Sequence, residues 1–141
     1  MCITILKGKM TTNDAAYIAG LFDSQGTVEY VKRKQHRKGK KKPYSYWCIR
    51  CEMSMPDKEV MEWVHETIGN GTLNKREGKK TWRWRCSYRD ALTFVKIIWP
   101  FAIVKLHKIE QIIDHYEPRA QELGDNVVDL ETERIIRRVW P

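Results

Sequence analysis

Residues 13–28 read NDAAYIAGLFDSQGTV, and the rest of the chain is organised around this stretch. Its first part has the composition of a helix, which Thr12 or Asn13 can cap at the start. Gly26 can end that helix, because glycine adopts the left-handed conformation without strain. We therefore expect a helix over residues 14–24 that passes directly into a turn carrying polar side chains.

One face of this predicted helix carries small residues. Ala16 and Gly20 stand four residues apart, and small side chains at both positions let a second helix approach closely. Tyr17 and Leu21 lie beside them and add apolar area. We expect Ala16, Tyr17, Gly20 and Leu21 to form a contact with another helix of the same kind.

Residues 18–26, IAGLFDSQG, resemble the nine-residue signature of the LAGLIDADG homing endonucleases. Five positions are identical to the signature, namely Ala19, Gly20, Leu21, Asp23 and Gly26. Three others are conservative changes, namely Ile18, Phe22 and Ser24. The alternative interpretation is an amphipathic helix that happens to end in an Asp-x-x-Gly sequence, and the length of the match favours the family.

One position departs from the signature. In the family the eighth position is an Asp or Glu whose carboxylate binds the catalytic divalent metal, and here it is Gln25. The resemblance implies Mg²⁺ or Mn²⁺ as the cofactor, with Ca²⁺ as a non-catalytic substitute, and a further metal contact from the backbone carbonyl of Ser24. An amide offers a neutral oxygen, whereas a hard cation prefers charged oxygen ligands. We therefore expect Gln25 to lower the affinity for metal.

The resemblance also implies a basic catalytic residue in the loop after the third helix. Aligning residues 100–105, PFAIVK, with that loop makes Lys105 the candidate, and Lys108 is its rival in a shifted register. A cation at this place would stabilise the negative charge that develops on oxygen in the transition state. An ordinary surface lysine at the start of a helix is an equally good interpretation of Lys105.

The length of 141 residues suits a single domain, residues 1–141. No apolar run is long enough to cross a membrane, and the first residues resemble no signal peptide, so we expect an intracellular protein without a membrane partner. The four histidines form no recognisable metal or general-base pattern. The cysteines also lack the spacing of a metal site, and we expect reduced thiols at Cys2, Cys48, Cys51 and Cys86.

Positive charge is concentrated in two windows of the sequence. The formal net charge is +8, and residues 32–42 contain eight Lys or Arg and no acid. Residues 75–85 contain six Lys or Arg and one acid, so the two windows carry +13 and leave −5 for the rest of the chain. This segregation favours one electropositive surface that faces a polyanion. A solvated run of charge is the alternative for residues 32–42 taken alone.

Beyond the first helix, the pattern predicts two hairpins and several helices. The expected strands are residues 27–33 and 44–53, around a long basic turn, and residues 72–76 and 81–87. The expected helices are residues 58–68, 90–99, 105–116 and 126–140. Pro56 and Asp57 open the first of these, and the glycine-rich residues 69–71, beginning with Gly69, stop it. One antiparallel sheet with its helices on one face belongs to the α+β class.

Strand alternation assigns the inner and outer faces of this sheet. The expected inner residues of the second and fourth strands are Trp47, Ile49, Cys51, Met53, Trp82, Trp84 and Cys86. Stacking of Trp82 and Trp84 on nucleotide bases is the alternative. The side chains between them, including Arg50, Arg83 and Arg85, should then project from the outer face.

The LAGLIDADG resemblance implies an αββαββα core over about residues 12–118, with a saddle-shaped antiparallel sheet. The helix expected at residues 126–140 would form a C-terminal extension of this core, in residues 119–141. The chain contains one copy of the motif, and one-motif members pair as homodimers through the motif helix. Each subunit would then read half of a near-palindromic DNA site. Two helices crossing at Ala16 and Gly20 would bring both Gln25 turns together over a minor groove.

The outer face of such a sheet would contact double-stranded DNA. Arginine donates to guanine, Gln and Asn pair with adenine, and lysine more often contacts phosphate. The candidates for guanine are Arg33, Arg50, Arg76, Arg83 and Arg85. The candidates for adenine are Gln35 and Asn74, and those for phosphate are Lys38, Lys40, Lys41 and Lys42. Tyr46 lies on the same outer face and is a further candidate contact.

Two functions are compatible with these patterns. The first is a site-specific, metal-dependent DNA endonuclease of the intron-homing type, weakened at Gln25. The second is a module on the same scaffold that never cleaves, either a DNA-binding regulator or an intron-RNA maturase. Gln25 favours the second function, whereas the basic hairpin and Lys105 favour the first.

Overall fold

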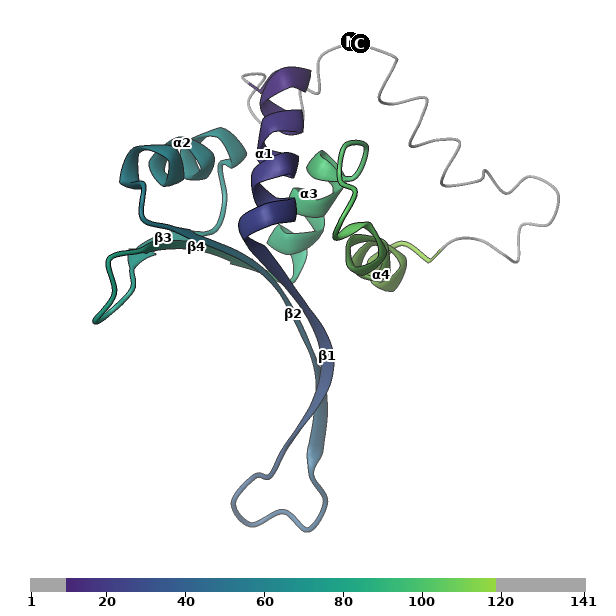
Figure 1. Cartoon of the computed structure of the whole chain (residues 1–141). Helices are drawn as coiled ribbons and strands as arrows, with labels where there is room; N and C mark the ends of the chain where they lie inside the picture. The colour runs from purple at the N-terminus through teal and green to yellow at the C-terminus, as the bar shows by residue number, and fades with distance from the viewer. Residues whose placement is uncertain (1–9, 119–141) are drawn as a thin grey trace, which may run out of the picture.

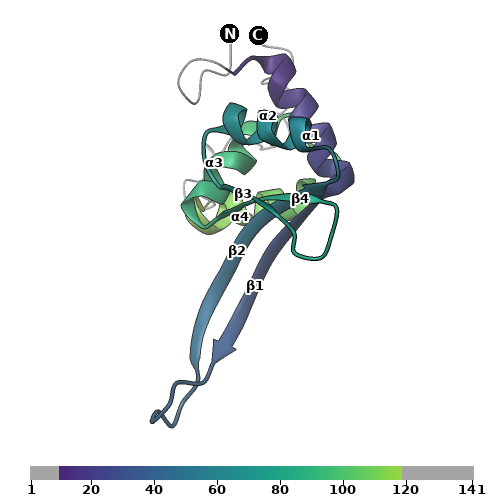
Figure 2. The ribbon, with the colours of Figure 1, turned by 90° about the vertical axis from the view of Figure 1, so that its left-hand side faces the viewer.

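The computed structural model describes residues 10–118, which form four helices and four strands. In chain order these are α1 (Thr12–Gln25), β1 (Gly26–Gln35), β2 (Tyr44–Met55), α2 (Lys58–Ile68), β3 (Thr72–Lys75), β4 (Trp82–Ser87), α3 (Arg89–Ile98) and α4 (Leu106–Tyr116). The helices lie on one side of a curved sheet, and the β1–β2 hairpin extends well beyond them (Figure 1, Figure 2). The predicted α+β class is confirmed. The helix predicted at residues 126–140 lies outside the described residues.

The four strands form one antiparallel sheet in the order β1-β2-β4-β3. Each hairpin therefore contributes its second strand to the middle of the sheet, where Cys51 of β2 pairs with Cys86 of β4. This arrangement brings two segments that are far apart in sequence into direct register. The long β1–β2 ladder, from Gly26 opposite Met53 to Gln35 opposite Tyr44, forms the extended arm.

The core lies between the sheet and the helices. Ile49, Cys51 and Met53 of β2 and Trp84 and Cys86 of β4 are buried, as alternation predicts. Trp47, however, is 37% exposed, so its assignment to the core is wrong. Trp47 lies on the β1–β2 arm, at the edge of the helix layer. There it stacks on Tyr30 with ring centroids 4.7 Å apart and contacts His115 of α4.

Both predicted caps of the first helix are wrong in detail. The residue that caps α1 is Thr11, whose side chain accepts a hydrogen bond from the backbone N–H of Asp14 at 3.1 Å, while the carboxylate of Asp14 accepts one from the N–H of Thr11. This reciprocal pair is a capping box. Gly26 is extended, with φ −94° and ψ 166°, and not left-handed.

Gly26 is needed for a different reason, which is close packing against Phe22. A Cβ atom at Gly26 would lie 2.3 Å from Cδ1 of Phe22 and 2.6 Å from its carbonyl oxygen. The ring of Phe22 is buried and meets Phe94 of α3 edge to face at 5.0 Å, so it cannot move aside freely. The chain passes from α1 into β1 with no loop between them, and glycine at position 26 allows this close passage over Phe22.

None of the helices in residues 10–118 is both long and apolar enough to span a membrane.

The second helix follows its prediction closely, since Asp57 caps its start and Gly69, with φ 84°, is its left-handed C-cap. Strands β1 and β2 each extend two residues beyond the predicted ends, to Gln35 and Met55. The extension of β1 lengthens the hairpin arm, whereas that of β2 lies at the other end of the strand, where Met55 pairs with Trp82 of β4.

Candidate nucleic-acid interface

The face of the sheet that points away from the helices is polar. Its outward positions alternate with the buried ones, and the register sets them side by side across the four strands. Seven of the predicted DNA contacts share this face, namely Arg33, Gln35, Tyr46, Arg50, Asn74, Arg83 and Arg85. Arg76 does not belong to a strand, because it lies in the β3–β4 turn, where its N–H donates to the carbonyl of Thr81.

Polar side chains form rows across this face. Arg83 of β4 lies opposite Ser54 of β2 on one side and Asn74 of β3 on the other. The next row places Arg85 opposite Glu52. Each row thus combines donors and acceptors from neighbouring strands, which suits hydrogen bonding to base edges.

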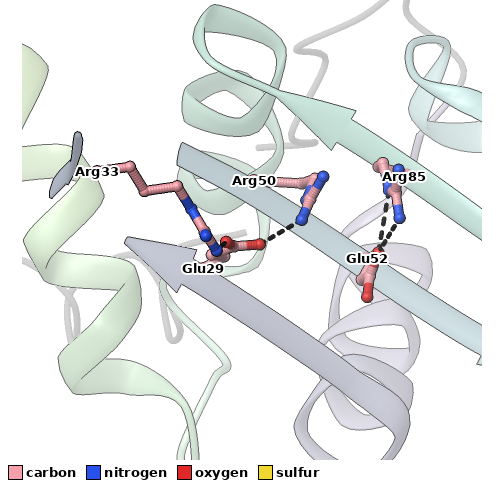
Figure 3. Close-up of polar contacts among 5 residues, drawn as sticks. All are labelled: Glu29, Arg33, Arg50, Glu52 and Arg85. Carbon is pink, nitrogen blue, oxygen red and sulfur yellow. Dashed lines mark hydrogen bonds and ion pairs between the residues drawn. The ribbon is translucent and has the colours of Figure 1, made fainter. Parts of the chain in front are cut away.

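Two glutamates pair with three of the predicted arginines (Figure 3). Glu29 of β1 forms ion pairs with Arg33, on the same strand, and with Arg50, which is directly opposite on β2. Glu52 accepts a hydrogen bond from Nε of Arg85 at 3.0 Å and forms an ion pair with its Nη2 at 2.9 Å. Sequence reasoning missed these pairs. Alternation alone put Glu29 and Arg33 on one face, but the other partners required the strand register.

The charge of Glu29 is fixed by its partners. The hydrogen bond from the Arg33 guanidinium lowers the pKa of Glu29 to about 2, against the opposing effect of burial, and Arg50 contributes further. The carboxylate is therefore ionised at neutral pH. Three guanidiniums and two carboxylates leave this part of the sheet with a net charge of only +1.

The loop at residues 36–43 forms the basic end of the arm. Its four predicted phosphate contacts are all exposed, namely Lys38, Lys40, Lys41 and Lys42. The guanidinium of Arg37 lies 4.3 Å from the ring centre of Tyr44, a cation–π contact that supports the base of the loop. Lysines from one side of the loop line an open hollow of about 530 Å³ with Arg37 and Tyr44. Positive charge is thus concentrated far from the helices (Figure 1).

The end of α1 is joined to the start of α4 by Asp23. Its carboxylate accepts hydrogen bonds from the backbone N–H groups of Ile103, at 2.8 Å, and Lys105, at 3.1 Å. Nζ of Lys105 in turn donates to the backbone carbonyl of Asp23 at 3.2 Å. These contacts bring Lys105 to the same turn as Gln25, while Lys108 lies on an exposed position of α4. Sequence reasoning noted Asp23 as part of the motif but missed this function.

The residues at this turn do not fit a tightly bound divalent metal. Gln25 is exposed and offers only a neutral oxygen. Both oxygens of Asp23 accept backbone N–H groups, and the hydroxyl of Ser24 donates to the carbonyls of Gly20 and Leu21. Within residues 10–118, no group of three or more His, Cys, Asp or Glu could hold a metal. The backbone carbonyl of Ser24 is left as the candidate ligand.

The predicted contact face of α1 is uncovered in the single chain. Ile18 and Phe22 point into the core, whereas Ala16 and Gly20 are exposed and Tyr17 is 56% exposed. Leu21, the fourth predicted contact residue, is only partly buried, and it packs against the edge of the core. A Cβ atom at Gly20 would meet no other atom within 4 Å. Nothing in residues 10–118 therefore fills the space beside this face of the helix at Gly20.

Solved structures of homing endonucleases have the same fold. The chain is similar to the homing endonuclease I-CvuI in complex with its target, with a TM-score of 0.62 and 13% identity over 73% of this chain and 65% of that chain. It is also similar to the archaeal intron-encoded homing endonuclease I-Vdi141I complexed with DNA, with a TM-score of 0.60 and 15% identity over 89% of this chain and 79% of that chain.

A third similar structure is the homing endonuclease I-TnaI, with a TM-score of 0.57 and 16% identity over 88% of this chain and 82% of that chain. No family model and no curated protein sequence matches the chain. The resemblance seen in residues 18–26 is thus confirmed at the level of the fold, which is that of the homing endonucleases. The chain spans just under two thirds of the I-CvuI chain in the first of these comparisons.

Proposed function

We propose that this chain is a site-specific DNA-binding protein of the homing-endonuclease type, which acts on duplex DNA as a homodimer and whose cleavage is weakened at Gln25. One observation supports this most strongly. Seven predicted DNA contacts share the outer face of one sheet, opposite the helices, on a fold that I-CvuI and I-Vdi141I use in complexes with DNA.

The shape of the sheet suits a DNA duplex. A two-stranded ribbon fits the major groove, and the β1–β2 arm is such a ribbon with polar side chains on one face. The exposed lysines at the end of the arm are placed to meet phosphates, which supply affinity without sequence preference. The rows of arginine and amide side chains nearer the helices are suited to reading bases.

The uncovered face of α1 supports a homodimer. Ala16 and Gly20 would allow two copies of the helix to cross closely, and Tyr17 would lose its exposure. The two-fold axis would then pass near the C-terminal ends of the two copies of α1, so that the two Gln25 turns lie together. Two sheets related in this way would read the two halves of a near-palindromic site.

Hydrolysis of a phosphodiester would use the groups at this turn. A divalent metal, when bound, supplies charge neutralisation and an activated water. Lys105, held at the turn by Asp23, would stabilise the developing negative charge of the transition state. Gln25 supplies no anionic oxygen, so metal binding and cleavage should be weak.

The alternative function is a binding module that does not cleave. Gln25 favours it, and so does the use of both Asp23 oxygens by backbone N–H groups. Such a module would regulate DNA or bind intron RNA on the same scaffold. The two proposals differ in what restoring a carboxylate at position 25 should do.

The deciding experiment is a cleavage assay. We expect the unmodified chain to bind a duplex selected from a random library and to cleave it poorly in magnesium or manganese. Gln25→Glu should restore metal-dependent double-strand cleavage, because the substitution returns one charged ligand per subunit. Lys105→Ala in that background should slow cleavage by about 10- to 1,000-fold with little change in binding.

The control is Lys108→Ala in the same Gln25→Glu background, since Lys108 is the rival candidate on an exposed position of α4. It should cleave normally. If the Gln25→Glu protein binds the selected duplex tightly and still leaves it intact, the endonuclease proposal fails. The non-cleaving module then takes its place.

A further inference from the structure

We propose that Glu29 is a positioning residue for DNA recognition, which holds the guanidiniums of Arg33 and Arg50 so that they select a base sequence over the phosphate backbone. This inference rests on the proposed DNA-binding function. It is carried by the ion pairs of Glu29 with both arginines on the outer face of the sheet (Figure 3).

Glu29 lies deeper than the arginines that it binds. Its side chain is 20% exposed, whereas Arg50 is 31% and Arg33 is 51% exposed. Glu29 is also directly opposite Arg50 in the β1–β2 register, so their side chains are immediate neighbours across the two strands. The carboxylate therefore lies beneath a layer of guanidiniums that faces outwards.

Pairing with Glu29 leaves donors free for DNA. An arginine has five N–H donors in a rigid planar fork, and the contact to Glu29 occupies one terminal nitrogen of each guanidinium. Nε of Arg50 is buried, but the other terminal nitrogen of each guanidinium can still donate to the acceptors on a guanine edge. Fixing the fork in advance reduces the entropy that ordering a long side chain costs on binding.

The same pairing works against non-specific binding. Glu29 and Glu52 offset two of the four positive charges of Arg33, Arg50, Arg83 and Arg85 on this face, so less net positive charge is available there to attract phosphates. The loop at residues 36–43 has no acid at all. We thus assign the charge-driven, non-specific part of the affinity to the loop at the end of the arm. Discrimination between base sequences is assigned to the centre of the sheet.

Two substitutions of Glu29 separate its charge from its positioning. Glu29→Gln removes the charge, whereas Glu29→Asp keeps it on a side chain too short to reach both arginines. Binding of the full chain is measured to a duplex selected against the unmodified protein and to a random duplex of equal length, over a range of salt concentrations. The ratio of the two Kd values reports discrimination, and the salt slope reports phosphate contacts.

We expect both variants to lower the discrimination ratio about tenfold, within the range that one bidentate base contact supplies. Only Glu29→Gln should also tighten random binding and steepen the salt slope, by about 0.9 for each additional phosphate neutralised. Glu62→Gln is the matched control, because Glu62 pairs with Lys58 on helix α2, away from the sheet. It should change neither quantity.

Thermal unfolding establishes that each variant is folded at the assay temperature, and if Glu29→Gln is not, Glu29→Asp carries the test alone. A ratio that stays unchanged in Glu29→Asp overturns the positioning role, even if Glu29→Gln changes the salt slope. If the unmodified chain prefers no selected duplex to random DNA, the proposed function fails and this inference falls with it. If the unmodified chain prefers the selected duplex and neither substitution lowers the discrimination ratio, only the inference about Glu29 fails.

Discussion

Gly26 has no room for a side chain, because α1 turns into β1 directly over the ring of Phe22. A methyl group there would lie 2.3 Å from the ring and 2.6 Å from a backbone oxygen, which cannot rotate away. We expect Gly26→Ala to lower the free energy of unfolding by about 1–3 kcal/mol through overpacking. The measurement is urea unfolding followed by circular dichroism.

Gly20→Ala provides the comparison for that prediction. Both glycines belong to the same motif, but a Cβ atom at Gly20 meets nothing within 4 Å in the single chain. In dilute solution this change should be neutral or stabilising by up to about 1 kcal/mol, because alanine favours a helix interior over glycine. Equal losses of stability in both variants would contradict the packing explanation of Gly26.

The depressed pKa of Glu29 predicts an acid-sensitive contribution to stability. Its pKa is about 2 in the folded protein, held down by Arg33, and about 4.5 without these partners. The ionised form is favoured by folding, so its contribution is complete above about pH 4.5 and is lost as the pH falls towards 2. We expect Glu29→Gln to reduce the loss of stability between about pH 5 and about pH 3, as measured by urea unfolding.

The matched variant for this pH experiment is again Glu62→Gln. Glu62 lies 3.6 Å from Lys58 on an exposed helix surface, where an ion pair contributes little. Its pH profile should follow that of the unmodified chain. A Glu29→Gln profile with the same acid limb would show that the Arg33 and Arg50 contacts do not stabilise the fold.

At the scale of elements, the proposed function assigns phosphate contacts to the loop at residues 36–43 and base contacts to the outer face of the sheet. We expect Lys40, Lys41 and Lys42, changed together to Ala, to flatten the slope of log affinity against log salt by about 0.9 for each phosphate that is no longer neutralised. These lysines are exposed at the loop, so the sequence preference should survive. The measurement is binding of selected and random duplexes at several salt concentrations.

Arg83→Ala is the counterpart of the lysine variant. Arg83 lies in the row with Ser54 and Asn74, near the middle of the sheet. We expect it to cost about 1–3 kcal/mol on the selected duplex and much less on random DNA. If the lysine and Arg83 variants behaved alike, the assignment of phosphate contacts to the loop and of base contacts to the sheet would be wrong.

The elements themselves were largely predictable from local patterns. Period-two alternation identified Ile49 and Trp84 as core, and Asp57 and Gly69 marked the ends of a helix, because such signals act over a few residues. The α1 cap was missed although a local signal marks it, because Thr11 and Asp14 have the spacing of a capping box. Thr12 and Asn13 are also good cap residues, but neither has an acidic residue three positions later.

The candidate site was predictable only where it lies within one segment. Residues 18–26 contain the motif, and strand parity placed the outer arginines on one face. Arg50 meets Glu29 through the β1–β2 register, and Arg85 meets Glu52 because β2 pairs with β4. Asp23 contacts Ile103 and Lys105, which lie 80 and 82 positions further along the chain. Such contacts are set by topology, which a single sequence does not display.

At the scale of the whole molecule, the uncovered face of α1 predicts a dimer. Gly20→Leu should block the close approach of two helices without disturbing the chain's own core, because the space at Gly20 is open. We expect sedimentation to show a dimer for the unmodified chain and a monomer for this variant. Binding of a palindromic duplex should weaken at the same time.

Lys79→Leu is the control for the dimer prediction. Lys79 is an exposed residue of the β3–β4 turn, away from α1, so a leucine there adds apolar surface without touching the proposed contact. Its mass in solution should match that of the unmodified chain. A monomer at every concentration of the unmodified chain would refute the dimer.

Asp23 has a consequence for how this protein can diverge. It binds the loop before α4 through the backbone N–H groups of Ile103 and Lys105, which every residue type except proline provides. The exposed side chains of Ile103 and Val104 can therefore change during evolution while Lys105 stays at the motif turn, and proline is the substitution excluded at either anchor. Distant relatives should be sought by the aspartate and a lysine at this spacing, with the residues between them ignored.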